Sequence, residues 1–448
     1  MRPFPRPKFS HEPNRNVAEL VSIAYGEIKR SYRSGKSDGR GSYILLSSPI
    51  CVVPQILVNL FSIERVKMKS VQVKIKTLTP IYTGGTDNRT EQIHTTGIMG
   101  SLRWWYEAIL RGYGLKACDP TSHSCLYDSS KGKSIEEQLC SACQIFGATG
   151  YARRFSLEVI PHDFSAWERG VREPALNLRP FDRTRGWFFN PGRVGAEELI
   201  LTGENAAVDR MLELLRFMEH YSSIGAKPQH GYGVFKIESI KDQQTNSPIP
   251  NPVCLEASLG NQFIGELPDL RTFTFFKFRF NPQNPNWWTQ VSGIKELRTR
   301  RDDWAIVEKQ AADGMVPVSP ALKNYLRYGH DWPGSIAFWL FGTMSGKDKI
   351  RSKISFSWAY RDGAVWEVRG WVYIPQDQTG RAFYNYADNL RQLRTILEDP
   401  QNWIRALGLE PSFNLQSEVT IEPKHTPWMP RTTTDIKSFL DQALRERN

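Results

Sequence analysis

Residues 97–113 read GIMGSLRWWYEAILRGY, and their spacing is that of an amphipathic helix. The large apolar residues recur at intervals of four, three and four, which places them on one helical face. They are Ile98, Leu102, Trp105 and Ile109. Trp104 lies off this face, and we expect it to pack against a neighbouring element, because large aromatic side chains belong more often to cores than to ligand platforms.

Segments with strand or helix periodicity surround this stretch and predict a βαββαβ unit. The expected elements are a strand at 71–80, the helix at 97–113, strands at 153–161 and 197–203, a helix at 207–225 and a strand at 233–240. This order is that of a ferredoxin-like unit.

The same order begins again in the second half of the chain. The expected elements are a strand at 272–280, a helical region at 319–341, strands at 353–360 and 365–375, and a helix at 383–398. Locally, IFGATGYARRFSL (145–157) and LFGTMSGKDKIRSKISF (340–356) share an apolar–Phe–Gly–small order that leads through basic residues into a strand. We interpret this as internal duplication, with chance as the alternative. The expected fold class is α+β, with two ferredoxin-like (βαββαβ, RRM-like) domains in tandem and a cysteine-rich insertion.

Four segments follow from this pattern. Residues 1–67 are an N-terminal extension that is poorly structured or not native, and 68–242 are the first domain. Residues 243–267 are a linker, and 268–448 are the second domain. The uncharged stretch 41–63 is long enough for a membrane span, but its prolines and amides argue against one. We therefore expect no membrane contact, and a working protein that begins near Met68.

Four of the six cysteines fall within 26 residues, in the loop 117–143. They are Cys118, Cys125, Cys140 and Cys143. Thiolates at such spacing suit a structural zinc ion, with His123 able to replace one thiol, and four buried free thiols are the alternative. Clustered cysteines argue against a secreted disulfide framework, so a reducing, cytoplasmic location is expected.

The formal net charge of +11 and the pI near 9.3 favour an anionic partner, with nucleic acid first among candidates. Candidate RNA contacts fall in three places. The helix start offers backbone N–H groups and donors at Gly97, Gly100, Ser101 and Arg103. The turn before the strand at 153–161 offers Gly147, Gly150, Arg153 and Arg154. The loop IGAKPQHGYGVF (224–235) offers Lys227, His230, Gly231, Tyr232 and Gly233, with Tyr232 as a stacking ring; a plain helix cap and tight turn is the alternative.

These motifs also carry a resemblance. LTPIYTGG (78–85), TTGIMGSLRWWYEAILRGYG (95–114), CSACQIFGATGYARRF (140–155) and GAKPQHGYGVF (225–235) resemble the RAMP superfamily of CRISPR proteins. More narrowly they are similar to the first subunit of type III-B Cmr effector complexes. The resemblance implies two ferredoxin-like domains, guide RNA, target RNA and other Cmr effector subunits as partners, and a role in antiviral defence. It implies a structural subunit at the 3′ end of the guide, not a nuclease.

Three hypotheses remain open at this point. The first is a non-catalytic RNA-binding subunit that holds RNA through shape and backbone contacts. The second is a metal-independent endoribonuclease acting on guide RNA, for which His94 and His230 are the available acid and base. The third is a protein-only scaffold, which would bind no RNA in isolation.

Overall fold

The computed structural model describes twelve ranges: residues 67–84, 92–119, 125–161, 165–166, 176–183, 185–249, 259–262, 265–343, 350–375, 387–409, 415–422 and 431–445. The predicted extension 1–67, apart from Lys67, lies outside them, as do His123 and part of the predicted linker. By its internal contacts, the segment Val66–Asn448 is one compact unit. Below, the first half denotes residues 67–249 and the second half residues 265–445. The proposed division into separate domains stays a prediction.

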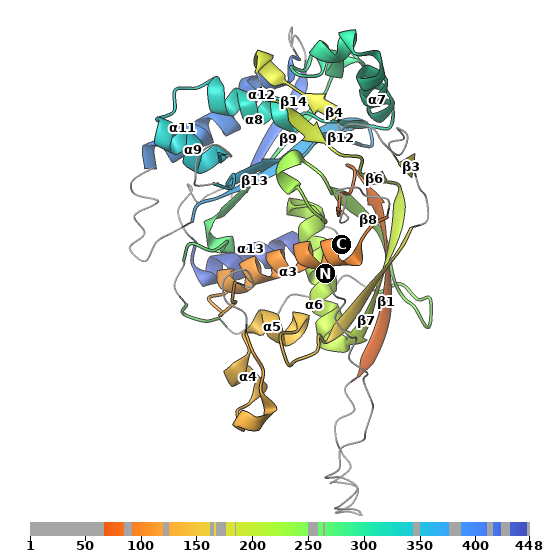
Figure 1. The fold of residues 1–448 in the computed structure, drawn as a ribbon, viewed down its shortest axis with the longest axis vertical. Helices are drawn as coiled ribbons and strands as arrows, with labels where there is room; N and C mark the ends of the chain where they lie inside the picture. Colours follow the sequence, from red (N-terminus) through yellow and green to blue (C-terminus); the bar gives the residue numbers. More distant parts are fainter. Residues whose placement is uncertain are drawn as a thin grey trace, which may run out of the picture. The chain divides into compact units, whose positions relative to one another are not determined.

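The first half is built on a four-stranded antiparallel sheet of order β2-β7-β1-β8 (Figure 1). Its strands are β1 (Met68–Thr77), β2 (Phe155–Pro161), β7 (Ala196–Glu204) and β8 (Phe235–Asp242). In β1 every second side chain is buried, and Val71, Val73 and Ile75 are 0% exposed. This alternation gives the sheet one apolar face, which the helices must cover.

Two long helices cover that face, α3 (Thr95–Gly112) and α6 (Asn205–Tyr221). The predicted apolar stripe of α3 is buried, with Ile98 and Leu102 at 0% exposure. Trp104 packs against Trp105, Phe273 and Trp371, as its position off the stripe led us to expect. The helix therefore contacts the sheet of its own half and strands of the second half.

The second half contains an antiparallel sheet of order β10-β12-β13-β9-β14, with β11 paired to β13. Its strands are β9 (Phe273–Asn281), β10 (Met315–Val316), β11 (Ile354–Phe356), β12 (Ala359–Asp362), β13 (Val365–Tyr373) and β14 (Gln416–Glu422). Its helices are α7 (Arg301–Ala312), α8 (Ser319–Tyr328), α9 (Gly334–Phe341), α11 (Ala387–Glu398) and α12 (Pro400–Leu407). The sheet order β12-β13-β9-β14 matches the order β2-β7-β1-β8 of the first half. When the four strands of each half are numbered along the chain, both sheets have the order 2-3-1-4.

The single strand expected at 353–360 is wrong, because the chain forms two short strands there, β11 and β12. They are separated at Ser357 and Trp358. The backbone N–H of Trp358 donates to the carbonyl of Gly231, so the chain bends toward the first half at this point. The strand is therefore interrupted at the point where the two halves contact each other.

The first four residues of β9, Phe273 to Phe276, are buried on both faces of the strand, which joins the two cores. Phe273 and Phe275 pack into the core of the first half, where both contact Trp105. Phe276 and Phe278 point the other way and pack in the core of the second half. A strand buried on both faces reads as a continuous apolar run, which explains the sequence FTFFKF.

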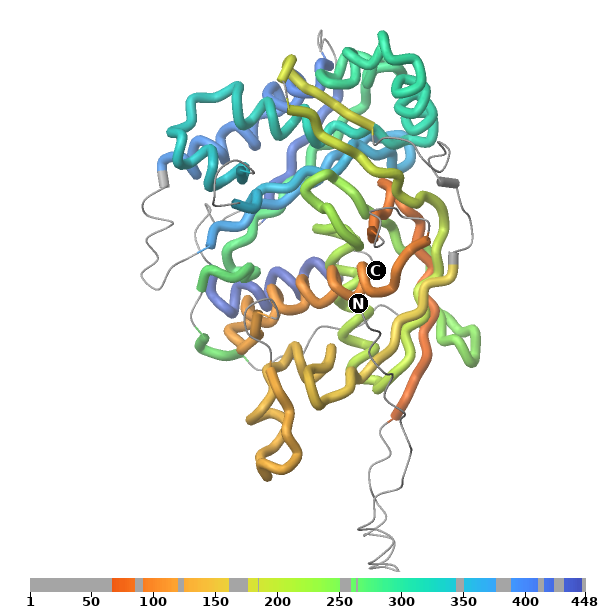
Figure 2. Tube along the Cα trace, viewed as in Figure 1, coloured from red at the N-terminus to blue at the C-terminus, as the bar shows by residue number. Residues whose placement is uncertain are grey.

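The C-terminal helix α13 (Thr433–Arg445), blue in Figure 2, returns to the first half and packs against α6. Gly112 of α3 permits this return, because a Cβ there would lie 3.3 Å from Ile436 Cγ2 and 2.8 Å from Leu270 Cβ. Helix α13, like α7, α12 and β14, was not expected from the sequence.

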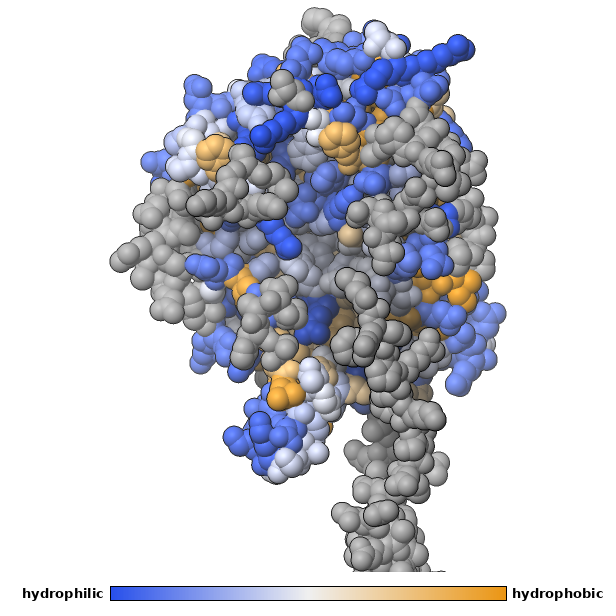
Figure 3. Space-filling model, in the orientation of Figure 1, coloured by the Kyte–Doolittle hydropathy of each residue, from blue (hydrophilic) through white to orange (hydrophobic). Residues whose placement is uncertain are grey.

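Shorter elements complete the described fold. They are α4 (Ile135–Gln138), α5 (Ser141–Phe146), and the strand pairs β3 (Ser165–Ala166) with β6 (Arg193–Val194) and β4 (Leu176–Leu178) with β5 (Trp187–Phe189). The segment around α4 protrudes and is largely hydrophilic (Figure 3). Among the described helices, none has the length and apolar character needed to cross a membrane.

Candidate functional site

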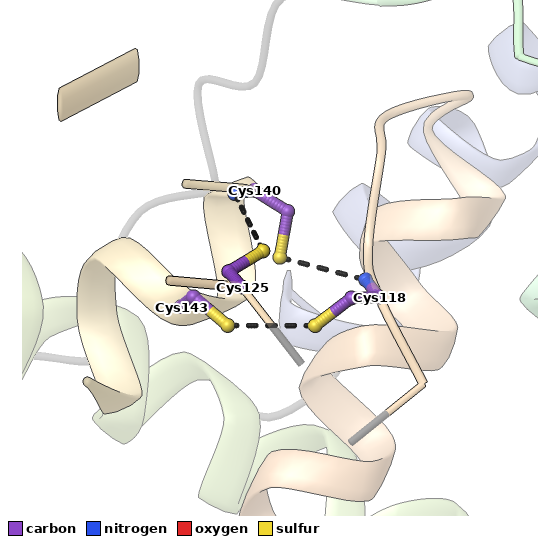
Figure 4. Close-up of side chains that lie close together, drawn as sticks. All are labelled: Cys118, Cys125, Cys140 and Cys143. Carbon is purple, nitrogen blue, oxygen red and sulfur yellow. Dashed lines mark hydrogen bonds between the residues drawn. The ribbon is translucent and has the colours of Figure 1, made fainter. Parts of the chain in front are cut away.

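Four cysteine thiols converge at one point between α3 and α5 (Figure 4). The sulfurs of Cys118, Cys125, Cys140 and Cys143 lie within 4.8 Å of one another. The sulfurs of Cys118 and Cys143 are 3.4 Å apart. Zinc–sulfur bonds of about 2.3 Å place tetrahedral sulfurs about 3.8 Å apart, so this donor set fits a metal ion that prefers thiolates. The four predicted ligands could thus hold a metal ion.

Backbone geometry holds the four sulfurs together. Cys140 is the N-terminal cap of α5, and Cys143 follows on the first turn of the same helix. The N–H of Cys118 donates to the Cys140 sulfur and the N–H of Cys140 donates to the Cys125 sulfur, each at 3.4 Å. Donors aimed at sulfur favour thiolate over thiol, which is the form that binds a metal.

The pKa values of the clustered thiols are shifted in opposite directions. A hydrogen bond from the Cys143 thiol is the main reason that the pKa of Cys140 falls to about 4. The same hydrogen bond raises the pKa of Cys143, and burial raises the pKa of Cys118. A metal ion bound by all four sulfurs would displace the remaining thiol protons.

Arg103 of α3 connects the cysteine cluster with the turn that follows α5. Its guanidinium donates to the Cys143 sulfur at 3.2 Å, to the Gly147 carbonyl at 3.5 Å and to Glu107 Oε1 at 2.8 Å. Arg111, one turn beyond Glu107, donates to the Cys118 carbonyl at 3.1 Å. Arg103 was predicted to bind phosphate directly, whereas in this structure it is engaged in these internal contacts. Its positive charge lies where excess thiolate charge would accumulate.

The cysteines also fix the base of the protruding insertion, residues 126–138. Within it, Ser134 and Glu137 form a capping box that starts α4. At its base, the N–H of Tyr127 donates to the Thr149 carbonyl at 2.9 Å. A Cβ on Gly150 would lie 2.2 Å from the Tyr127 carbonyl oxygen, so this glycine is required by the close approach. The base of the insertion and the 147–150 turn are therefore packed against each other.

The predicted glycine loop meets the start of α3. The N–H of Gly225 donates to the Ser101 hydroxyl at 3.0 Å. Gly97 is needed for packing, because a Cβ there would lie 2.8 Å from Thr83 Cβ. Gly100 is different: it is exposed, and a Cβ there would meet no atom within 4 Å. The helix start, the glycine loop and the 147–150 turn thus all gather around α3.

The far side of the glycine loop packs against the second half. The Pro228 carbonyl accepts from Ser355 at 2.7 Å, and the His230 carbonyl accepts from Ser319 and from the Trp358 indole, each at 2.8 Å. Gly231 and Gly233 are buried. These contacts turn the loop into a junction between the halves.

Tyr232, predicted as a stacking ring, is 0% exposed. Its hydroxyl donates to the Asn190 carbonyl at 2.6 Å, and its ring contacts Tyr82, Phe189 and Trp358. A base could reach this ring only if the loop moved away from the second half. In this packing Tyr232 has a structural role.

His230 lies close to two lysines, its loop neighbour Lys227 and Lys323 of the second half, and the sequence did not reveal the second of these. Burial, together with the charges of Lys227 and Lys323, lowers the pKa of His230 to about 4. Lys227 donates to Asn190 Oδ1 at 2.9 Å, with its ammonium 4.1 Å from the Tyr82 ring centre. Lys323 of α8 is 94% buried, since its exposed fraction is 6%, and burial lowers its pKa to about 7. No local pattern links Lys323 to His230, because they are brought together by packing alone.

The two arginines of the basic turn have different surroundings. Arg153 is exposed, and within the described ranges its side chain makes no hydrogen bond or ion pair. Arg154 is half-buried, donates to the Tyr151 hydroxyl at 3.0 Å and pairs with Glu204 at 3.6 Å. Arg153 is therefore the better candidate for a phosphate contact.

The comparison with protein families finds a match within the first half of the chain. Residues 74–236 match the family described as the RAMP superfamily. All predicted RNA-contact residues and all four clustered cysteines lie inside the RAMP region.

Solved structures show remote similarity. Cmr1 from Pyrococcus furiosus, in its apo form, is 14% identical, with 69% of this chain and 89% of that chain covered and a TM-score of 0.34. A chain of the type III-B Cmr-beta complex bound to cognate target RNA and AMPPnP is 11% identical, with 84% and 99% covered and a TM-score of 0.34. Cmr6 from Pyrococcus furiosus is 13% identical, with 38% and 98% covered and a TM-score of 0.21. The search of curated proteins found no match.

Proposed function

We propose that this chain is a non-catalytic RNA-binding RAMP subunit of a type III-B CRISPR (Cmr) effector complex. It would act in the cytoplasm in antiviral defence, beside other Cmr subunits. It would contact guide and target RNA near the 3′ end of the guide. The observation that carries the proposal is the convergence of three RAMP-like motifs around α3, through Ser101 to Gly225 and through Arg103 to Gly147.

The fold supports a tandem arrangement of two ferredoxin-like units. In each half the first strand lies between the third and the fourth, and the second strand pairs with the third. All neighbours on these paths are antiparallel. This is the connectivity that a βαββαβ order requires, so we propose that the two halves arose by duplication.

Zinc is the metal we propose for the cysteine cluster. Four thiolates in a closed set are typical of a structural zinc site, which has no open position for a substrate. The ion would be held by Cys118, Cys125, Cys140 and Cys143, and it would fix the base of the insertion and the 147–150 turn. Its contribution would be to the shape of the RNA-facing turn.

A non-catalytic role agrees with the state of the candidate acid and base. Burial and the nearby lysine charges lower the pKa of His230 to about 4, which disfavours a role as a protonated general acid at neutral pH. Its ring is also enclosed by Trp187 and Phe189. His94 caps the start of α3 without a side-chain hydrogen bond to the helix, which leaves its ring suited to an RNA contact.

Filter binding of single-stranded RNA to the full chain at several salt concentrations tests the proposal. We expect Arg153→Ala to weaken binding by about 1 kcal/mol for unrelated sequences alike, because phosphate contacts position the RNA without reading it. The slope of log K against log salt should become shallower by roughly one. Arg301→Ala, which removes an exposed arginine at the start of α7, is the matched control.

Two outcomes would contradict the proposal. Absence of RNA binding by the wild-type chain would favour the protein-only scaffold. Metal-independent cleavage of guide-length RNA to a cyclic phosphate, lost in His94→Ala or His230→Ala, would favour the endoribonuclease.

A further inference from the structure

The turns after α5 and α9 have the same geometry. Each helix ends in Phe-Gly, at Phe146–Gly147 and at Phe341–Gly342. Gly147 has φ 83° and ψ 163°, and Gly342 has φ 78° and ψ 165°. Both glycines lie in a backbone region that other residues rarely adopt, so the sequence repeat noted above is also a structural repeat.

The hydrogen bonds around the two turns correspond as well. The carbonyl two residues before each glycine accepts from the strand that follows, at 3.0 Å from Arg154 and at 2.9 Å from Lys353. Each glycine carbonyl also accepts from an arginine of a preceding helix. Arg103 of α3 donates to the Gly147 carbonyl at 3.5 Å, and Arg327 of α8 donates to the Gly342 carbonyl at 2.8 Å. Arg327 is therefore the counterpart of Arg103, and α8 is the counterpart of α3.

An exposed cluster of arginine and aromatic side chains lies beside the second turn. The Arg183 guanidinium lies 3.6 Å from the Tyr328 ring centre. Arg327 lies 5.3 Å from the Tyr328 centre and 5.7 Å from the Phe338 centre. Both rings are 47% exposed. Tyr328 ends α8 and Phe338 lies on the adjacent α9 (Figure 1).

The charges of this cluster are available to an anion. Within the described segments, Arg183 and Arg327 form no ion pair with an acidic side chain. Exposed rings flanked by cations without acidic partners suit single-stranded nucleic acid, because each base has a face that stacks and each phosphate has a charge that pairs. An acidic protein segment would satisfy the arginines but would leave two rings half-exposed.

We propose that the second half carries its own site for a single-stranded RNA segment. Bases stack on Tyr328 and Phe338, and phosphates pair with Arg183 and with the outer edge of Arg327. The inference rests on the proposed RNA-binding function and adds a second contact region to it, at the duplicated Phe-Gly turn.

The test uses the full chain and an oligouridine that contains 4-thiouridine. The double variant Tyr328→Leu/Phe338→Leu keeps an apolar side chain at each position and removes both aromatic rings. The variant Arg183→Gln removes a positive charge. We expect affinity to fall about tenfold for each ring lost, with crosslinks in the wild type mapping to α8 and α9. Phe188→Leu is the matched control, since Phe188 is 57% exposed on β5 and is not part of the cluster. Thermal unfolding confirms that each variant is folded.

The outcomes separate this inference from the proposed function. If Arg153→Ala weakens binding while the Tyr328/Phe338 and Arg183 variants bind normally, the second site does not exist and the proposed function stands. Crosslinks that map only to the first half would lead to the same conclusion, that the second site does not exist. Failure of the wild type to bind the oligouridine would overturn both. Retained RNA affinity with lost binding to an acidic partner protein would overturn the second site in favour of a protein interface.

Discussion

Gly100 lies on the exposed side of α3, and packing does not require a glycine at this position. A helical glycine costs about 1 kcal/mol relative to alanine, and a Cβ at this position would meet open space. We therefore expect Gly100→Ala to raise the free energy of unfolding by about 0.5–1 kcal/mol. If RNA approaches the helix start, the same change should weaken RNA binding. Urea unfolding and filter binding measure the two effects, and higher stability with unchanged affinity would remove Gly100 from the RNA surface.

Gly231 is the opposite case within the same candidate site. Its φ is +86°, and a Cβ there would lie 2.6 Å from the backbone nitrogen of Trp358. We expect Gly231→Ala to lower the free energy of unfolding by about 2 kcal/mol or more, through backbone strain and displacement of the second half. Chemical denaturation checks this, with Gly100→Ala as the comparison. A neutral effect would show that the glycine loop is not held against Trp358 in solution.

Helix α5 and the insertion depend on the cysteine cluster at the scale of the element. The insertion has few buried side chains of its own, so its order must come from its base. We expect elemental analysis of never-chelated protein to give one zinc per chain. Chelation or Cys143→Ser should increase amide hydrogen exchange in residues 126–150 and leave β9 protected. Protein purified without metal, with a protected insertion, would contradict the zinc proposal.

Helix α6 buries a carboxyl group whose titration should be visible in stability. Burial raises the pKa of Glu213 from its ordinary value of 4.5 to about 8. Between these values the folded state keeps a proton that the unfolded state has released, so stability falls as pH rises from 4.5 toward 8. We expect Glu213→Gln to raise the free energy of unfolding by on the order of 3 kcal/mol at pH 8.5 and by little at pH 5.

Urea unfolding at the two pH values measures this difference. Glu136→Gln, on the exposed side of α4, is the control that should show no such dependence. An effect of Glu213→Gln that is equal at both pH values would mean that Glu213 is already ionised in the fold.

At the scale of the whole molecule, a buried arginine joins the two halves. Arg369 of β13 donates to the Glu219 carbonyl at the end of α6, and to the Tyr360 hydroxyl at 2.6 Å. It also pairs with Glu367 Oε1 at 3.5 Å. We expect Arg369→Met to lower the free energy of unfolding by about 3 kcal/mol, because it leaves buried acceptors without a donor. Arg361→Met, at an exposed position of the neighbouring strand β12, should be near neutral.

The same variant tests whether the halves unfold together. Wild-type protein should give one transition by tryptophan fluorescence and by hydrogen exchange in both sheets. In Arg369→Met the transitions of the first and second sheets should separate. Coincident transitions in the variant would show that β9 and α13 couple the halves without Arg369.

The sequence by itself determined the local elements and the metal-type cluster. The alternation of Val71, Val73 and Ile75 specifies a half-buried strand, and the stripe that includes Ile98 and Leu102 specifies α3, because a residue's periodicity follows from backbone geometry. The cysteines could be assigned for a similar reason: Cys140 and Cys143 are close in the chain, so a single helix start brings their sulfurs together.

Only the tertiary structure decided which faces are covered and by what. Tyr232 and Gly231 read as open loop residues, yet Trp358 packs against both from the second half. Arg103 was expected to contact RNA at the helix start, yet it donates to a cysteine sulfur. Lys323, for which the sequence predicted no role, lies buried beside Trp187. Local patterns fix the direction of a side chain along its own element, whereas its partner comes from a segment far away in the chain. That choice depends on the joint packing of two cores, which no short stretch of sequence encodes.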